Sequence, residues 1–345
     1  MKIKGGKFEI PKQIHSVELL RGIASAMVCY FHLAKGNINF LPDQSVIKKT
    51  ASIGWSGVEI FFVISGFVIP FAMFQKKYTI RNFITFLQKR IIRIEPPYLI
   101  SILLVVFLNF VSTLSPYYRG SPFHIDWPNL LGHIAYLNVF TGGKWLNDVY
   151  WSLAIEFQYY LLIAVSFTLI VSGKMYWRFL FIILFLLSSF IPFPPNSFVF
   201  TYAGYFIAGI LLFQLVCNII GFVEFFISIG LFIWLFVYQQ GLFLTGITLI
   251  TMLVILFVNR VPAFLRYIGL ISYSLYLIHV PVGGRIINIS EVKTTNIVLR
   301  ELMVFVAFLI CILAASVFYR LFEKRFKTFS SSIKYDQTSP NYQAG

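Results

Sequence analysis

The chain is dominated by long apolar stretches that are separated by short polar segments. Runs of about 20 apolar residues recur along nearly the whole sequence, and each is long enough to cross the hydrocarbon core of a bilayer. The pattern predicts an all-α, polytopic membrane protein. The ten expected spans fall near residues 17–36, 53–74, 92–112, 149–171, 176–192, 197–217, 219–238, 241–258, 264–283 and 297–319.

The placement of basic residues predicts the orientation of these spans. An even number of spans puts both termini on one side, and a cytoplasmic N-terminus leaves most of the 28 Lys and Arg residues in cytoplasmic segments. Within the long outer loop 113–148, we expect the apolar segment 127–140 to be re-entrant or interfacial. A membrane domain over 1–329 is expected to be followed by a polar, disordered tail over 330–345.

Composition supports a membrane protein and excludes an ordinary soluble domain. The chain is 58% hydrophobic and only 12% charged, about half the charge of a typical soluble domain. Its net charge of +15 comes mainly from residues at the ends of apolar runs, where they meet anionic lipid rather than nucleic acid. Neither the three separate cysteines nor the histidines show the spacing of a metal site, so we predict none.

The first apolar run contains ionisable residues, which are costly inside a membrane. Arg21 and His32 are eleven residues apart, so they share one helix face about 16 Å apart along the axis. Glu18 lies one turn before Arg21 and is expected to pair with it. The alternative is an interfacial arginine and a histidine that bonds to nearby backbone.

Polar side chains also lie inside the second, fourth and ninth spans. Glu59 stands in an apolar stretch and serves either a site or a structural ion pair with a buried arginine. Ser152 and Glu156 are one turn apart at the outer end of the fourth span. In the ninth span Ser272, Tyr276 and His279 form a polar stripe, which either faces a substrate or bonds neighbouring helices.

Two arginines lie at the inner leaflet just before a pair of prolines. Arg90 and Arg93 share a helix face, and their planar guanidinium groups suit the phosphates of a nucleotide-type donor. Anchoring to lipid headgroups is the alternative. His15, His124 and His133 are interpreted as surface or interface residues.

These motifs, in this order, resemble those of the membrane-bound acyltransferase-3 family, which includes O-antigen and exopolysaccharide acetyltransferases. The matching motifs are Arg21-x10-His32, G-V-E-I-F-F-V-I-S-G-F at 57–67 (which contains Ser65), Arg90-x-x-Arg93, W-S-L-A-I-E at 151–156 (which begins with Trp151), and S-Y-S-L-Y-L-I-H at 272–279 (which contains Tyr273). Glu18 stands where an Asp is usual. The run that begins at Glu323 lacks a proline often found after this Glu, so we assign it no function.

The resemblance implies ten helices around a central conduit in a bacterial inner membrane. Acyl-CoA, most simply acetyl-CoA, would be a substrate that docks on Arg90 and Arg93 from the cytoplasm, and no cofactor would stay bound. His32 would act as general base or as a transient acyl carrier, with Arg21 and Glu18 orienting the site. The acceptor would be a hydroxyl of an envelope glycan or glycolipid outside the membrane. The residues expected to shape the acceptor site are Glu59, Ser65, Trp151, Ser152, Glu156, Tyr273, Tyr276 and His279.

Three other functions were weighed against acyl transfer. A transporter or flippase for an envelope glycan also suits intramembrane charges around a conduit, but such proteins are commonly built on inverted repeats, and none is visible. A glycan polymerase would not need the combination of Arg21 and His32 with Arg90 and Arg93. A purely structural scaffold would not explain costly residues such as Glu59 and His32.

Overall fold

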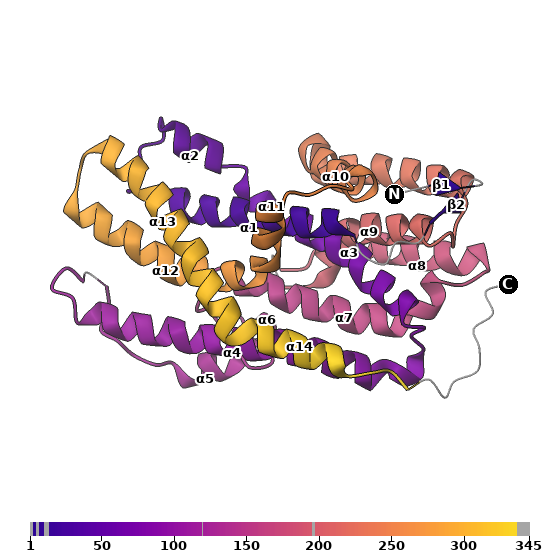
Figure 1. Ribbon diagram of the computed structural model, residues 1–345, viewed down its shortest axis with the longest axis horizontal. Helices are drawn as coiled ribbons and strands as arrows, with labels where there is room; N and C mark the ends of the chain where they lie inside the picture. Colours follow the sequence, from indigo (N-terminus) through magenta and orange to yellow (C-terminus); the bar gives the residue numbers. More distant parts are fainter. Residues whose placement is uncertain (1–2, 5–6, 10–13, 119, 195–196, 337–345) are drawn as a thin grey trace.

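The fold is a bundle of helices that run roughly along the long axis of the molecule (Figure 1). The computed structural model describes residues 3–4, 7–9, 14–118, 120–194 and 197–336. Its helices are α1 (His15–Lys35), α2 (Val46–Ala51), α3 (Gly57–Gln75), α4 (Phe83–Thr113), α5 (Trp127–Gly132), α6 (Asn138–Thr141), α7 (Tyr150–Ile170), α8 (Met175–Ser188), α9 (Ala203–Val216), α10 (Phe222–Phe257), α11 (Ala263–Leu270), α12 (Ser272–Lys293), α13 (Ile297–Phe318) and α14 (Lys324–Ser332). Two short strands, β1 (Ile3–Lys4) and β2 (Lys7–Phe8), pair antiparallel.

The predicted all-α, polytopic fold is confirmed. Within the described residues, seven helical segments are long and apolar enough to cross a membrane, or eight if the bent pair α11–α12 counts as one span. The difference from the ten expected spans has two sources. The expected span 176–192 corresponds to α8, which has only 14 residues, and α10 covers both 219–238 and 241–258.

A break in α10 explains how one helical segment occupies two expected spans. At 1.5 Å per residue, 36 helical residues would extend about 54 Å, well beyond a hydrocarbon core of about 30 Å. The backbone leaves the helical region at Gly241, where φ is 77°. Glycine tolerates this left-handed conformation because it has no Cβ. The break divides α10 into two parts, each close to the length of one crossing.

The expected ninth span is also broken, between α11 and α12. These helices meet at an angle of 67° around Ile271. The helix after the bend, α12, begins at Ser272 and continues to Lys293, ten residues past the predicted end of the span. Pro281 lies inside α12 and does not end it.

The two ends of the bundle differ in charge. We call the end that carries the α3–α4 turn and α14 the basic end, because it holds Lys76, Arg81 and the lysines of α14. The far end carries α2 and the α12–α13 turn, which are linked by Ser45 donating to Glu301 at 2.6 Å. Both ends are visible in Figure 1, with the basic end on the right. Arg90 and Arg93 lie inside α4, because this helix starts at Phe83 and not near residue 92.

The expected outer loop and tail contain more structure than the sequence indicated. Residues 127–140 form α5 and part of α6. His133 is buried, which corrects its interpretation as a surface or interface residue, and the Leu146 amide donates to its Nε2 at 3.0 Å. Burial lowers the pKa of His133 below its ordinary value. At the other end α14 extends to Ser332, so the first residues of the expected tail are helical, and 337–345 lie outside the described residues.

Candidate active site

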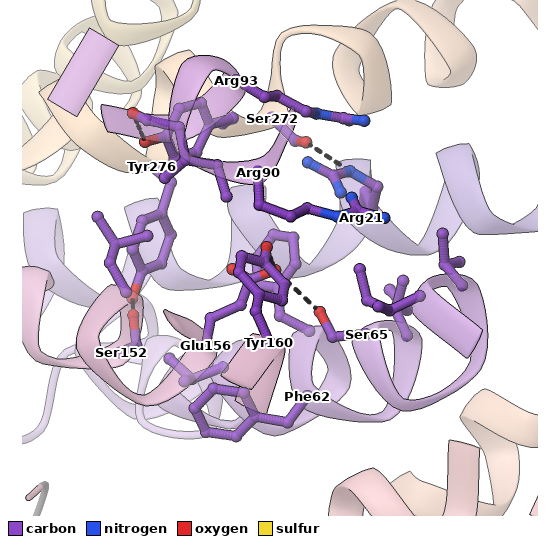
Figure 2. A pocket seen from close by; sticks show the side chains of 18 of the residues that line it. Arg21, Phe62, Ser65, Arg90, Arg93, Ser152, Glu156, Tyr160, Ser272 and Tyr276 are labelled. Atoms are coloured by element: carbon purple, nitrogen blue, oxygen red, sulfur yellow. Dashed lines mark hydrogen bonds between the residues drawn. The ribbon is translucent and has the colours of Figure 1, made fainter. Parts of the chain in front are cut away.

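A cavity opens inside the basic half of the bundle, and Figure 2 shows its lining. It is enclosed by α1, α3, α4, α7, α12 and the π-helical turn Tyr319–Glu323. Eight residues predicted from the sequence line it together: Arg21, Ser65, Arg90, Arg93, Ser152, Glu156, Tyr273 and Tyr276. Motifs from five distant parts of the chain therefore meet in one place.

Three arginines gather at one side of this cavity. Figure 2 shows the guanidinium groups of Arg21, Arg90 and Arg93 reaching the same region. Arg21 donates from Nε to Ser272 Oγ at 3.2 Å, and Arg90 lies over the ring of Tyr160 at 5.5 Å. Three like charges held this close favour an anionic ligand, because an anion relieves their mutual repulsion.

Next to the arginines, the carboxylate of Glu156 organises a second part of the cavity wall. Its Oε1 accepts from Ser65 Oγ at 3.1 Å and from the Tyr160 hydroxyl at 2.5 Å. Further along, the hydroxyls of Ser152 and Tyr276 lie 2.5 Å apart (Figure 2). Hydrogen bonds thus connect α3, α7 and α12 across the cavity.

Glu323 also lines the cavity, although the sequence analysis assigned it no function. Its Oε2 accepts from the backbone amide and the hydroxyl of Ser274, at 3.1 and 2.5 Å. Glu323 lies close enough to Arg21 to interact with it electrostatically. It ends a π-helical turn, a distortion that frequently occurs at functional sites. The spacing of polar and apolar residues follows the period of an α-helix here, so it does not reveal a π-helical turn.

A second pocket adjoins the cavity at the basic end and shares Arg90 and Arg93 with it. We call it the basic pocket. Its basic lining residues are Lys76, Lys89, Arg90, Arg93, Lys324 and Lys327, and no acidic residue is among the described residues that line it. Lys89 donates to the Ser330 carbonyl at 2.7 Å and so holds α14 against α4. A concentration of positive charge of this kind suits phosphate groups.

His32 does not line the cavity, although its helix provides Arg21. The connection runs through α12, where Tyr276 lines the cavity and its ring lies 6.1 Å from that of His279. His279 Nε2 in turn lies 3.2 Å from His32 Nδ1. The exposed carboxylate of Asp148, in the segment before α7, is close enough to act on His32 electrostatically. Ser272, Tyr276 and His279 each bond to α1 or α7, so the polar stripe connects α12 to its neighbouring helices.

The predicted pairing of Glu18 with Arg21 is wrong. Glu18 instead lies 3.6 Å from His15, and its side chain is 39% exposed. Three residues of an α-helix turn the chain through about 300°, so Glu18 and Arg21 point about 60° apart. That difference leaves Glu18 near the surface while Arg21 enters the cavity.

Three further predicted residues, Glu59, Trp151 and His279, lie outside the lining of the cavity. Glu59 is buried one turn into α3 at the far end, and the structure gives its Oε2 no hydrogen-bond partner. Trp151 stacks against Tyr202, with ring centroids 5.5 Å apart. Glu59 is also close enough to Tyr202 to act on it electrostatically, so both residues lie beside the Tyr202 ring. No group of three His, Cys, Asp or Glu residues in the described part of the chain could hold a metal ion.

A fold of apolar spanning helices around a cavity with buried charges defines a multi-pass membrane protein with a reaction or binding site inside its bundle. A family model described as an acyltransferase domain matches residues 14–321. The chain belongs to this family, the acyltransferase-3 family, and is a membrane acyltransferase. No curated protein and no solved structure matched the chain.

Proposed function

We propose that the protein moves an acyl group, most simply acetyl, from acyl-CoA to a hydroxyl of an extracytoplasmic glycan or glycolipid. The observation that carries this proposal is the continuity of the site. The basic pocket shares two arginines with the cavity, and side-chain contacts through Tyr276 and His279 connect the cavity wall to His32. The basic end faces the cytoplasm of a bacterium and the far end faces outward.

The basic pocket supports binding of a CoA-type donor. CoA carries a pyrophosphate and a further phosphate, and the pocket offers six basic side chains. Arg90 and Arg93 stand where pocket and cavity meet, so they hold the phosphates nearest the pantetheine arm. The arm then extends into the cavity and brings the thioester toward Tyr276.

His32 is the proposed general base. The hydroxyl oxygen of the acceptor attacks the thioester carbonyl while His32 takes the hydroxyl proton. The new carbon–oxygen bond forms, the carbon–sulfur bond breaks, and the proton passes from His32 to the CoA thiolate. If the acyl group instead rests briefly on His32, the same ring nitrogen attacks the thioester first. Tyr276 and Phe61 line the cavity with rings 5.8 Å apart, so the thioester has to pass them to reach His32.

The far end supports an acceptor that arrives from the opposite side. The exposed Asp148 lies close to His32, and a carboxylate accepts hydrogen bonds from sugar hydroxyls. Trp151 and Tyr202 present stacked aromatic rings at the outer starts of α7 and α9. Aromatic faces of this kind suit the apolar faces of sugar rings.

The test is the release of free CoA from acetyl-CoA by membranes that contain the protein and an acceptor glycan. His32→Ala should abolish release, because it removes the proposed general base, whereas His124→Ala in the outer loop should have no effect. Arg90→Ala should mainly raise the apparent KM for acetyl-CoA. Unchanged release by His32→Ala at equal protein level would remove His32 from the mechanism. Glycan translocation without CoA release would indicate a transporter instead.

A further inference from the structure

His32 and His279 form a pair of histidines from two different helices. His279 Nε2 and His32 Nδ1 lie 3.2 Å apart, and the ring centroids are separated by 5.1 Å. His279 is completely buried, whereas His32 keeps partial exposure. Each Nδ1 also lies 2.9 Å from the carbonyl oxygen four residues earlier in its own helix, that of Val28 or of Leu275.

These contacts assign the protons on both rings. A carbonyl oxygen only accepts hydrogen bonds, so an Nδ1 that bonds to one carries a proton. In a neutral imidazole the other nitrogen then has a lone pair. His279 Nε2 therefore accepts the Nδ1 proton of His32, and His32 Nε2 is left with its lone pair free.

The two acceptors of the His32 proton are not equivalent. The Val28 carbonyl belongs to the backbone ladder of α1, where it also takes the amide hydrogen of His32. His279 Nε2 is the acceptor that comes from outside the helix and has no other partner among the described contacts. The hydrogen bond between His279 Nδ1 and the Leu275 carbonyl, on the opposite side of the ring, holds this Nε2 in position.

We propose that His279 is a positioning residue that holds His32 in the tautomer with a free Nε2. This inference rests on the proposed function, in which His32 Nε2 takes the proton of the acceptor hydroxyl. Once Nε2 gains that proton, the ring is a cation, and its Nδ1–H donates a charge-assisted hydrogen bond to His279. His279 thus does with a neutral ring what a carboxylate does when it orients a catalytic histidine, while the proton leaves His32 Nε2 for the CoA thiolate as before.

The test is the tautomer of His32, measured by ¹⁵N NMR of histidine-labelled protein in lipid bilayers. The chain has 5 histidines, and the His32 signals are assigned by their loss in His32→Ala. We expect protonated Nδ1 and bare Nε2 in the unmodified protein. His279→Phe keeps an aromatic ring but removes the acceptor, so a mixture of tautomers is expected. His279→Gln places an oxygen near the position of Nε2 and should restore the single form.

Turnover gives a second measurement on the same variants. His279→Phe should lower kcat for CoA release by about tenfold, the effect of about 1.4 kcal/mol on a barrier, with little change in the KM for acetyl-CoA. His279→Gln should recover part of the loss. His133→Phe is the matched control, because His133 is also buried and hydrogen-bonded, but the hydrogen bonds described for its side chain go to Asn129, Asn138 and Leu146 and not to α1 or α12.

Two results would overturn the proposal. One is a His32 that carries its proton on Nε2 in the unmodified protein, a result that needs no variant to fold. The other is an unchanged His32 tautomer in His279→Phe. Absence of CoA release by the unmodified protein would instead contradict the proposed function, and the tautomer measurement would still decide the role of His279.

Discussion

The ion pair between Arg178 on α8 and Glu224 on α10 lies mostly inside the bundle. Arg178 Nη2 contacts both carboxylate oxygens at 2.7 Å, and the two side chains are 6% and 18% exposed. Arg178→Ala should lower the free energy of unfolding by about 3–5 kcal/mol, because it leaves Glu224 buried without its partner. Unfolding of the detergent-solubilised protein measures the change.

The double variant provides the control for this ion pair. Arg178→Ala combined with Glu224→Ala should lose less stability than the sum of the two single variants, since no charge remains unpaired. Strict additivity would show that the two residues contribute independently, and the buried pair would then not be the source of the loss.

Two lysines of α14 provide a test of the proposed donor site at the level of single residues. Lys324 and Lys327 line the basic pocket, whereas Arg325 on the same helix is exposed and does not. Replacing both lysines by Ala should raise the apparent KM for acetyl-CoA roughly fivefold, the sum of two weak, partly screened charge interactions. Arg325→Ala should leave KM unchanged. An equal rise in both proteins would point to general attraction by the basic end rather than to the pocket.

Much of the candidate site follows from helical spacing within single spans. Helical spacing placed Ser272, Tyr276 and His279 on one face of a helix. It also placed Arg21 and His32 on one face of α1, at two positions along the helix axis. The Glu18 pairing failed because spacing does not tell which of two neighbouring residues turns inward. The contact between His32 and His279 joins residues 247 positions apart in the sequence, so it depends on how α1 packs against α12.

Among the helices, α3 and α9 approach each other closely at two glycines. A Cβ added at Gly209 would lie 2.3 Å from the Val63 carbonyl oxygen, and one added at Gly66 would lie 2.2 Å from that of Phe206. Small residues such as Gly66 are typical of contacts between membrane helices, but the sequence of one span does not reveal its partner helix. The two glycines let the backbones of α3 and α9 meet.

Gly209→Ala should therefore destabilise the bundle by more than about 2 kcal/mol, because one of the two backbones has to move. Gly230→Ala in α10 is the matched control, since a Cβ there meets nothing within 4 Å. It should be neutral or stabilising by up to about 1 kcal/mol, because alanine favours a helix. Thermal unfolding in one detergent compares the two, and equal losses would contradict the close-packing argument.

Hydropathy predicted the existence of the helices better than their breaks. Each expected span coincides with a helical segment, because about 20 apolar residues are needed for a crossing. The 67° bend at Ile271 and the break at Gly241 depend on local backbone geometry. Glycine and proline are only weak indicators of such geometry, as the intact helix around Pro281 shows.

For the molecule as a whole, the charge difference between its ends predicts an orientation that labelling can test. Cys29, Cys217 and Cys311 are all buried, so background reaction should be low. A membrane-impermeant maleimide should label Ser121→Cys in intact cells. It should label Arg81→Cys, at the basic end, only after the cells are opened. The reverse pattern would place the basic pocket outside and would contradict a cytoplasmic donor.

The family match stops at residue 321, yet part of the cavity wall comes later in the chain. Glu323 faces the arginines, and Lys324 and Lys327 complete the pocket beneath them. A shortened protein that ended at the family boundary would keep the apolar crossings but leave Arg90 and Arg93 open to water along one flank. Recombinant versions meant for enzymology should therefore extend at least to residue 336, where α14 is already anchored by Lys89.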